Sequence, residues 1–261
     1  ESIYLIMSDL ICIAVRMKSS RLKKKALKNI AGKPLIERLL DRLISEFSKT
    51  SICLCTSDHP DDNALVEIAK KYEIPYIAGH QLDVMQRFII AGEQYDATNI
   101  VRVTGDNPLT DPMMIKKLLE FHKTSQAEYS YCEDIPIGAR SEVVSLNALK
   151  RIYGQLSNPN SSEYMTYMLN RPDKLSVKNL QLKDSESYEP KLSLTVDTME
   201  DFEFVESIYE HFKSSTASLK DIVNFCRSHS NYQNRLIEPL SSLPKTEGID
   251  YSFMDDKNLS Q

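Results

Sequence analysis

Basic residues are concentrated in one short segment near the start of the chain. Of the thirteen residues from Arg16 to Lys28, seven are Lys or Arg and none is acidic. The whole chain has a formal net charge of −5, so this local excess of positive charge is costly unless an anion offsets it. Ser19 and Ser20 add hydroxyl donors, and Arg side chains suit forked contacts with phosphate oxygens. The segment predicts a phosphate-binding loop, with a solvated basic loop or a contact surface for an acidic partner as the alternatives.

Two acidic residues come directly after apolar, strand-like segments later in the chain. Asp106 lies in VRVTGDNPLTDP (101–112), and Asp197 ends LTVD (194–197). A carboxylate at the end of a buried strand can reach a cation in a cleft, and Mg²⁺ prefers oxygen ligands while it keeps waters and substrate phosphates in its shell. Asp106 and Asp197 thus predict a magnesium site. The alternative is that Asp106 and Asp111 are turn and cap residues and that Asp197 caps a helix.

The first half of the chain alternates between strand-like and helix-like patterns, which must position these residues. Strands are predicted at 10–15, 52–55, 75–77 and 99–103, and helices at 35–47, 61–72 and 82–95. Asp58 or Asp61 is the expected cap of the second helix. This order is typical of an α/β fold with a mostly parallel, Rossmann-like sheet and helices on both faces. Because such sheets bind ligands at the carboxyl ends of their strands, the basic loop and the loop from Thr104 to Asp111 are expected to lie together.

The second half of the chain is less regular. Strands are predicted at 128–131, 142–144 and 192–196, and helices at 146–153, 161–169, 199–212 and 219–227. Ser218 is the expected cap of the last helix. We predict a single domain over 7–231 and a polar C-terminal tail over 232–261 that packs loosely or leads to a further segment.

The composition is that of an ordinary globular protein. With 261 residues, of which 41% are apolar and 26% charged, the chain is long enough for one large α/β domain. The net charge argues against broad binding to nucleic acid or membranes, and no apolar run reaches the roughly 18 residues that a membrane helix needs. Five cysteines, an odd number without zinc-site spacing, predict reduced and buried thiols and hence a cytoplasmic protein.

Four segments together resemble the cytidylyltransferases, the group that contains the CMP-sialate and CMP-KDO synthetases. VRMKSSRLKKK (15–25) is similar to the family's opening, Ala-Arg-x-Gly-Ser-x-Arg-Leu-Pro-x-Lys, and AGHQLDVMQRF (78–88) to its Gly-x-x-x-Asp-Val-x-x-Arg segment. VRVTGDNPLTDP and LTVDTMEDFEFV (194–205) are similar, in the expected order, to two later motifs of the spore-coat polysaccharide branch. The resemblance covers about Ile11 to Arg227 and implies a fold of the nucleotide-diphospho-sugar transferase type.

The resemblance also assigns roles to the residues that match the family's motifs. The CTP phosphates would be held by Arg16, Ser19, Arg21 and Lys25, the magnesium ion by Asp106 and Asp197, the cytidine near Thr104 and Gly105, and the edge of the nucleotide pocket would be formed by Asp83 and Arg87. The catalytic set would be Arg16, Arg21, Lys25, Asp106 and Asp197. GARSEVVS and SEYMTYM resemble a small acceptor-side and dimerisation subregion at about 125–190, which nominates Arg140, Glu142, Glu163, Tyr164 and Thr166 as acceptor-binding residues.

The chain departs from the family pattern in both regions. Lys18 and Lys24 stand where the family usually has Gly, and Lys23 replaces the usual Pro, so the phosphate loop lacks the family's backbone freedom. The spore-coat branch often has Arg-Glu-His-x-Thr where this chain has Ser-Glu-Tyr-Met-Thr (162–166), which suggests a different acceptor.

The resemblance implies a Mg²⁺-dependent enzyme that transfers CMP from CTP to a small anionic acceptor, an acidic sugar or a sugar or polyol phosphate, and releases pyrophosphate for surface polysaccharide biosynthesis. It further implies a homodimer without a nucleic-acid or membrane partner. Two alternatives stay open: a glycosyltransferase of similar fold that uses a nucleotide sugar, and a catalytically weak nucleotide-binding partner subunit. The departures at Lys18 and Lys24 motivate the second, whereas the Asp-x-Asp metal motif often found in the first is absent from the sequence.

Overall fold

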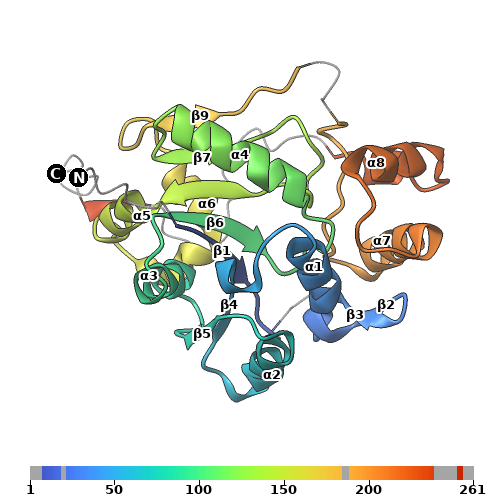
Figure 1. Ribbon diagram of the computed structural model, residues 1–261, viewed down its shortest axis with the longest axis horizontal. Helices are drawn as coiled ribbons and strands as arrows, with labels where there is room; N and C mark the ends of the chain where they lie inside the picture. Colours follow the sequence, from blue (N-terminus) through green and yellow to red (C-terminus); the bar gives the residue numbers. More distant parts are fainter. Residues whose placement is uncertain (1–7, 19–21, 184–187, 238–251, 255–261) are drawn as a thin grey trace.

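A seven-stranded sheet forms the centre of the protein (Figure 1). The structure is a computed structural model that describes residues 8–18, 22–183, 188–237 and 252–254. In spatial order the strands are β5 (Tyr76–Gly79), β4 (Ile52–Ser57), β1 (Asp9–Ala14), β6 (Asn99–Thr104), β8 (Glu142–Ser145), β7 (Tyr129–Tyr131) and β9 (Val177–Asn179). Among them β8 runs antiparallel to both of its neighbours and the other pairings are parallel, which confirms the predicted mostly parallel sheet.

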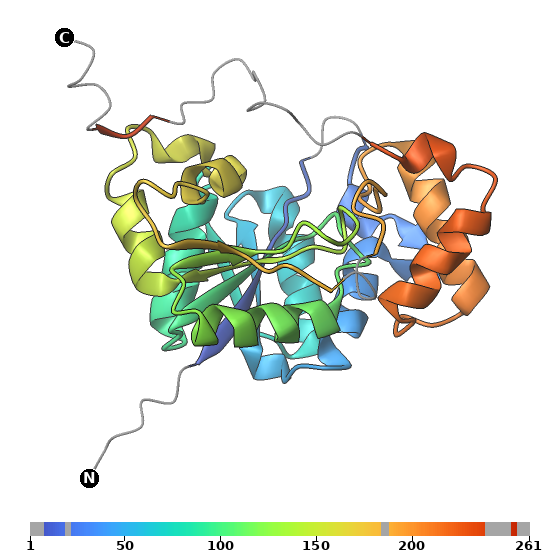
Figure 2. The same cartoon turned by 90° about the horizontal axis from the view of Figure 1, so that it is seen from above.

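Helices cover both faces of this sheet, as predicted (Figures 1 and 2). One layer contains α3 (Val84–Gln94), α5 (Leu146–Tyr153) and α6 (Met165–Leu169), and the other contains α1 (Leu35–Ile44), α2 (Asn63–Tyr72) and α4 (Pro112–Thr124). Residues of β1 alternate between the two layers: Ile11 and Ile13 join the core cluster with α1, and Leu10 and Cys12 join the cluster with α3. Because β1 is buried on both faces, its residues 10–14 form a continuous run of apolar residues.

The last two long helices, α7 (Met199–Phe212) and α8 (Leu219–Ser228), lie side by side at one end of the molecule. Next to them is a short hairpin of β2 (Asn29–Ile30) and β3 (Lys33–Pro34), whose turn donates the Ala31 N–H to Glu206 of α7 over 3.0 Å (Figure 2). Among the described residues, no helix is both long and apolar enough to cross a membrane.

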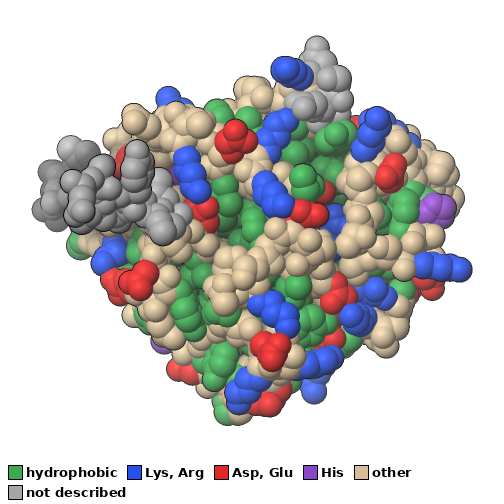
Figure 3. Space-filling view, viewed as in Figure 1, with side chains coloured by type: hydrophobic (Ala, Val, Ile, Leu, Met, Phe, Trp, Pro, Cys, Tyr) green, Lys and Arg blue, Asp and Glu red, His purple; other side chains and the backbone are tan. Residues whose placement is uncertain are grey.

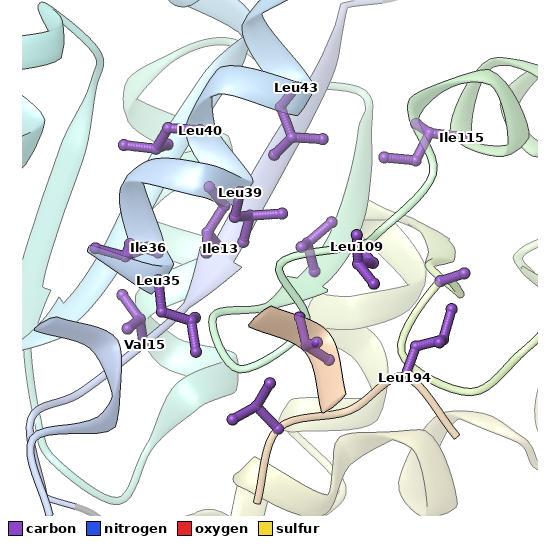
Figure 4. Close-up of a cluster of buried hydrophobic side chains, with 14 of the residues drawn as sticks. Ile13, Val15, Leu35, Ile36, Leu39, Leu40, Leu43, Leu109, Ile115 and Leu194 are labelled. Carbon is purple, nitrogen blue, oxygen red and sulfur yellow. The ribbon is translucent and has the colours of Figure 1, made fainter. Parts of the chain in front are cut away.

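Apolar anchors fix the loops that leave the sheet. Leu35 and Leu39 of α1 pack with Ile13 of β1, and Leu109 and Leu194, from loops far apart in the sequence, enter the same cluster (Figure 4). All five side chains are at most 1% exposed. This cluster lies beneath the loops that carry Asp106 and Asp197, so its packing determines where both carboxylates stand.

The sequence located the strongly periodic helices well but missed other elements. The helices at 146–153 and 199–212 are confirmed with the predicted bounds, and the Ser218 hydroxyl caps α8 by accepting the Asp221 N–H over 3.2 Å. The sequence did not predict α4, β9 or the hairpin of β2 and β3. The helix predicted at 161–169 is split into a 3-10 helix, η4 (Pro159–Tyr164), and α6.

The predicted cap of α2 is wrong. A 3-10 turn, η3 (Pro60–Asp62), precedes this helix, so α2 begins at Asn63 and Asp62 occupies its N-cap position. Neither Asp58 nor Asp61 caps the helix, and the ring of His59 accepts the Asp61 N–H instead. The extra turn displaces the helix start because Pro60 is suited to the first position of such a turn.

The strand predicted at 192–196 is also wrong, although this segment is extended. It makes only isolated bridges, Ser193 with Ile137 and Leu192 with Leu236. The Leu194 N–H donates to the Ile137 carbonyl over 2.7 Å, and the Val196 N–H donates to the Asp106 carbonyl over 3.1 Å. The segment therefore pairs with loops beyond the sheet, and this pairing places Asp197 beside Asp106.

Part of the C-terminal region packs firmly on the domain. Phe253 is fully buried and pairs with Leu156 at the end of α5, and the charged groups of Arg171 and Lys174 lie 4.6 and 4.5 Å from its ring centre. Loose packing, one of the two expectations for the tail, does not describe Phe253, although Met254 next to it is exposed. The domain boundaries themselves stay a prediction.

A glycine permits the contact between the loop before β8 and the segment at 192–196. Gly138 has φ of +90°, and a Cβ atom there would lie 2.5 Å from backbone atoms of Leu194 and Thr195. We expect Gly138→Ala to lower the free energy of unfolding by about 2–4 kcal/mol, because residues with a Cβ atom disfavour this φ value and because the added methyl group would clash with the backbone of Leu194 and Thr195. Urea denaturation measures this loss.

The matched control for this substitution is Gly154→Ala. Gly154 has φ of −67°, and the atoms nearest to an added Cβ are 3.5 and 3.8 Å away. Its expected change is below about 1 kcal/mol. Equal losses in the two variants would show that close approach at Gly138 is not the cause.

Candidate active site

A cavity of about 670 Å³ opens at the carboxyl ends of β1 and β6. Its basic lining residues are Arg16, Lys18, Lys25, Arg87 and Arg102, and its acidic ones are Asp106 and Asp197. Lys, Arg, Asp and Glu side chains are interspersed over the face of the molecule seen in Figure 3, so the excess of positive charge belongs to the cavity and not to that surface. A basic cleft in an acidic protein concentrates anionic ligands.

The two carboxylates predicted to hold a metal lie side by side in this cavity. Lys25 Nζ donates to Asp106 Oδ2 over 3.0 Å and to Asp197 Oδ1 over 3.1 Å. It also donates to the Val196 carbonyl over 2.6 Å. Residues 25, 106 and 197 are distant in the sequence, so the fold assembles this group from three separate loops.

Asp106 is placed by a close approach between two strand ends. The Gly105 N–H donates to the Ala14 carbonyl over 2.8 Å, and a Cβ atom on Gly105 would lie 2.6 Å from the Cβ of Val15. Only a glycine allows the loop after β6 to pass so close to the start of the basic loop. The Thr-Gly-Asp motif thus has a steric basis.

Asp197 is placed by the start of α7 but does not cap it. The cap is Thr198, whose hydroxyl accepts the Asp201 N–H, while the Asp201 carboxylate accepts the N–H groups of Thr198 and Asp197, each over 2.8 Å. Asp201 also forms an ion pair with Arg235. The alternative that Asp197 is the helix cap is therefore wrong. For Asp111 the cap alternative is confirmed, because its carboxylate accepts the Met114 N–H at the start of α4 over 2.8 Å.

The basic loop contributes to the cavity in part. Arg16, Lys18 and Lys25 line it, while Lys23 and Lys24 are exposed. The predicted phosphate ligands Ser19 and Arg21 lie outside the described residues. Lys24, which stands where the family usually has Gly, has φ of +51° and ψ of 34°. A residue with a Cβ is strained by about 1–2 kcal/mol in this left-handed conformation, so the departure from Gly has a physical cost.

A buried aspartate that the sequence reading missed fixes the start of the loop. Asp62 is 2% exposed, and its Oδ1 accepts the Met17 N–H over 2.7 Å. Its Oδ2 accepts from the Ser57 N–H and from the Thr56 hydroxyl, each over 3.1 Å, and from the Ser57 hydroxyl. The sequence indicated no separate role for Asp62, which lies next to the expected cap residue Asp61.

The pocket-edge residues Asp83 and Arg87 have different positions. Arg87 lines the cavity but is only 1% exposed, and its Nη1 donates to the carbonyls of His80 and Gln81. Burial lowers the pKa of this guanidinium. Asp83 does not line the cavity: its carboxylate caps α3 by accepting the Gln86 N–H over 2.9 Å and also accepts from the Tyr153 hydroxyl over 2.7 Å.

A second polar cluster contributes to the lining of the cavity. Arg102 Nη1 donates to Glu142 Oε1 over 3.1 Å and to Thr166 Oγ1 over 3.2 Å, and the Thr166 hydroxyl donates to Glu142 over 2.6 Å. Arg102 and Thr166 line the main cavity, as does Tyr164. Arg102 belongs to the motif at 101–112, but the sequence did not identify it as a site residue. Its role follows from the register of β6 and β8, which places Arg102 opposite Glu142.

Arg140 has a different environment from the other predicted acceptor residues. It lines a smaller recess of about 170 Å³ that shares Arg102, Thr104 and Asn107 with the main cavity. Its guanidinium donates to three carbonyls, those of Ile135, Glu133 and Pro190, over 2.8, 2.9 and 3.0 Å. Burial lowers its pKa. The side chain of Glu163 lies outside the described residues.

The donor set suits a divalent cation that a substrate helps to ligate. Asp106 and Asp197 offer hard carboxylate oxygens at the mouth of a basic cavity, with side chains 32% and 31% exposed. Among the described residues, no group of three or more His, Cys, Asp or Glu side chains could enclose a metal. Two carboxylates without a full protein cage match the preference of Mg²⁺ for waters and phosphate oxygens.

A mostly parallel sheet, a basic loop after β1, and a cavity that pairs Asp106 after β6 with Asp197 before α7 are the features expected of a nucleotidyltransferase. Residues 10–239 match the sequence model of the family described as Cytidylyltransferase, and the chain therefore belongs to the cytidylyltransferase family.

Relatives and solved structures agree with this membership. An uncharacterised protein of Methanocaldococcus jannaschii is 30% identical over 223 residues, which are 85% of this chain and 91% of the relative. The spore coat polysaccharide biosynthesis protein SpsF of Bacillus subtilis is 29% identical over 78% of this chain and 88% of its own length. A cytidylyltransferase structure from Leptospira borgpetersenii superposes with a TM-score of 0.79 over 90% of this chain and all of that chain, at 24% identity, and so shares the fold.

The environment of Asp62 predicts a stabilising role for its charge. In Asp62→Asn, the amide would face the Ser57 N–H or the Met17 N–H with its own donors, so at least one hydrogen bond is lost in a buried site. We expect the free energy of unfolding to fall by about 2–4 kcal/mol, measured by urea denaturation.

Asp61→Asn is the matched control. Asp61 is the adjacent residue, and its side chain is 74% exposed. Its expected effect is within about 0.5 kcal/mol. A similar, small effect at both positions would contradict the anchoring role of Asp62.

Proposed function

We propose that the protein transfers a cytidylyl group from CTP to a small anionic acceptor and releases pyrophosphate, with a divalent cation, most simply Mg²⁺, as cofactor. The observation that carries this proposal is the pairing of Asp106 and Asp197 inside a cavity with five basic lining residues. The name of the Bacillus subtilis relative refers to polysaccharide biosynthesis, and we extend that role to this chain. The homodimer and the cytoplasmic location stay predictions.

The proposed chemistry is an in-line substitution at the α-phosphorus. An acceptor hydroxyl loses its proton and its oxygen bonds to the α-phosphorus, while the bond from that phosphorus to the bridging oxygen breaks and pyrophosphate leaves. Such a reaction depends on positioning and charge neutralisation and requires no covalent enzyme intermediate. A divalent cation on Asp106 and Asp197 would supply Lewis-acid charge at the phosphate when bound.

The chain's own residues supply the rest of the proposed mechanism. Arg16 and Lys25 face the cavity and are suited to neutralise the phosphates and the leaving pyrophosphate, and Arg21 shares this role by its motif position. Arg87, which is held by the carbonyls of His80 and Gln81, adds a further fixed positive charge to the cavity. Thr104 and Gly105 line the floor where we place the cytidine.

We place the acceptor against the cluster of Arg102, Glu142 and Thr166. This cluster lies on β6, β8 and α6, and its residues Arg102 and Thr166 line the cavity. Glu142 and Thr166 hold the Arg102 guanidinium in one orientation, as a residue that recognises an anion requires. Arg140 is committed to three backbone carbonyls and is better suited to shape the recess than to bind the acceptor.

Loss of Asp106 tests the catalytic assignment. With CTP, Mg²⁺ and a panel of sugar acids and sugar phosphates, the wild-type protein should release pyrophosphate, and Asp106→Ala should lower kcat by about two to four orders of magnitude. Asp58→Ala, at an exposed carboxylate that also follows a strand, should change kcat by less than about twofold. Near-normal turnover of Asp106→Ala would refute the assignment, and wild-type binding of CTP without release of pyrophosphate would favour a binding subunit.

Substitution of Arg102 tests the acceptor site. Arg102→Gln should raise the KM for the acceptor by about tenfold or more, because it removes a desolvated cation, and should change the KM for CTP by less than about threefold. Steady-state kinetics with each substrate varied in turn separate the two constants. If Arg140→Gln raises the acceptor KM and Arg102→Gln does not, the placement of the acceptor is wrong.

A further inference from the structure

We infer that the ammonium group of Lys25 and the divalent cation compete for the same two carboxylates, so that the protein takes up the metal together with the nucleotide and only weakly without it. This inference rests on the proposed function and concerns the order in which its two ligands bind. It assigns Lys25 two positions: on the carboxylates in the free protein, and on the nucleotide phosphates in the complex.

The hydrogen bonds of Lys25 are complete in its present position. An ammonium group has three N–H donors. They are matched by three oxygens: Asp106 Oδ2 at 3.0 Å, Asp197 Oδ1 at 3.1 Å and the Val196 carbonyl at 2.6 Å. A group with every donor engaged cannot also bind a phosphate, so Lys25 must release at least one of these three oxygens before it contacts the nucleotide, and a metal that takes up both carboxylates requires it to release those two.

Lys25 also fills the place that a metal held by both carboxylates requires. Its side chain is 13% exposed, whereas the two carboxylates are 32% and 31% exposed, so Lys25 is the most buried of the three charged side chains. A dication that binds both carboxylates beside the ammonium would face a like charge at close range in a partly buried site. Metal binding to the free protein is therefore opposed by both geometry and charge.

The backbone around Lys25 is fixed, so the side chain must make the change. Lys25 begins the 3-10 helix η1 (Lys25–Leu27), which is closed by hydrogen bonds from the Leu27 N–H to the Lys24 carbonyl and from the Lys28 N–H to the Lys25 carbonyl. The four-carbon stem of Lys25 can rotate without disturbing these bonds. Lys28 follows it in the loop but lies over the ring of Phe202, 5.5 Å from its centre.

A triphosphate removes both obstacles at once. Its oxygens accept the hydrogen bonds that Lys25 gives up, its negative charge offsets the ammonium, and it supplies further ligands to the metal. Metal and nucleotide are then linked by a favourable, negative coupling free energy, and each must raise the affinity of the other by the same factor.

The test is a titration of Mn²⁺ alone into the full chain, with free Mn²⁺ followed by electron paramagnetic resonance. Lys25→Met removes the competing ammonium and keeps an unbranched side chain of similar length. We expect it to bind Mn²⁺ about tenfold to a hundredfold more tightly than the wild type. Lys23→Met, which removes an exposed charge from the same loop, should alter Mn²⁺ affinity by less than about twofold.

Two further measurements complete the experiment. Adding Asp197→Asn to Lys25→Met should abolish the gain in Mn²⁺ affinity, which shows that the metal binds to this carboxylate pair. In calorimetric titrations, Mn²⁺ should raise CTP affinity strongly in the wild type and by a much smaller factor in Lys25→Met.

The inference is overturned if Lys25→Met binds Mn²⁺ no more tightly than the wild type. Should that variant not fold, the wild type alone decides: if CTP binds and Mn²⁺ affinity is nevertheless the same with and without CTP, the competition is refuted. Failure of the proposed function has a different signature, which is an absence of CTP binding under every metal condition, whatever the difference in Mn²⁺ affinity between wild type and Lys25→Met.

Discussion

The site depends on the need to neutralise two neighbouring carboxylates. Asp106 and Asp197 are 91 residues apart in the sequence, but in the fold their carboxylates are close enough to contact the same ammonium group. Two negative charges this close in space repel each other unless a cation lies between them. In the free protein that cation is Lys25, which contacts both. One ammonium group thus joins the loop after β1, the loop after β6 and the segment before α7. The same requirement for positive charge makes the place suitable for a divalent cation.

This charge arrangement is possible only because the backbones approach closely at two glycines. Gly105 lets the loop after β6 touch the end of β1 at Val15, and Gly138 lets the loop before β8 pair with the segment at 192–196. The chain has only seven glycines, and two of them serve these contacts. Leu109 and Leu194 belong to the core cluster of α1 and β1 (Figure 4). Apolar packing therefore fixes these two loops on the domain, and the glycines allow their polar groups to come together.

Much of the fold could be predicted because its determinants are local. The apolar spacing of α1 and the continuous apolar run of β1 follow directly from burial on one face of a helix and on both faces of a parallel strand. The segment at 192–196 was misjudged because its apolar, β-prone residues are buried against loops and not within the sheet. Composition alone does not distinguish these two environments.

The sequence predicted the site residues that belong to recognisable motifs. It did not predict roles that depend on contacts between distant parts of the chain. Asp106 and Asp197 could be paired from the sequence because both follow apolar runs, but the position of Lys25 between them is a property of the assembled loops. Asp62 serves the phosphate loop through one bond to the Met17 backbone, and no pattern in the sequence marks such a bond. The role of Arg102 depends on its register with Glu142 on the neighbouring strand, which the sequence alone does not reveal.

The departures of the basic loop from the family pattern also have a structural interpretation. Lys24 adopts a left-handed conformation that favours glycine, and it immediately precedes the lysine that holds the two carboxylates. Strain of this kind persists only where surrounding contacts fix the backbone, and here the 3-10 turn at Lys25–Leu27 and the buried Ala26 do so. The backbone at Lys25 is therefore held in place although Lys24 stands where the family usually has glycine. A fixed backbone with a long, rotatable side chain confines ligand-dependent change at this position to the side chain, and this is why the side chain of Lys25 can alternate between carboxylates and phosphates.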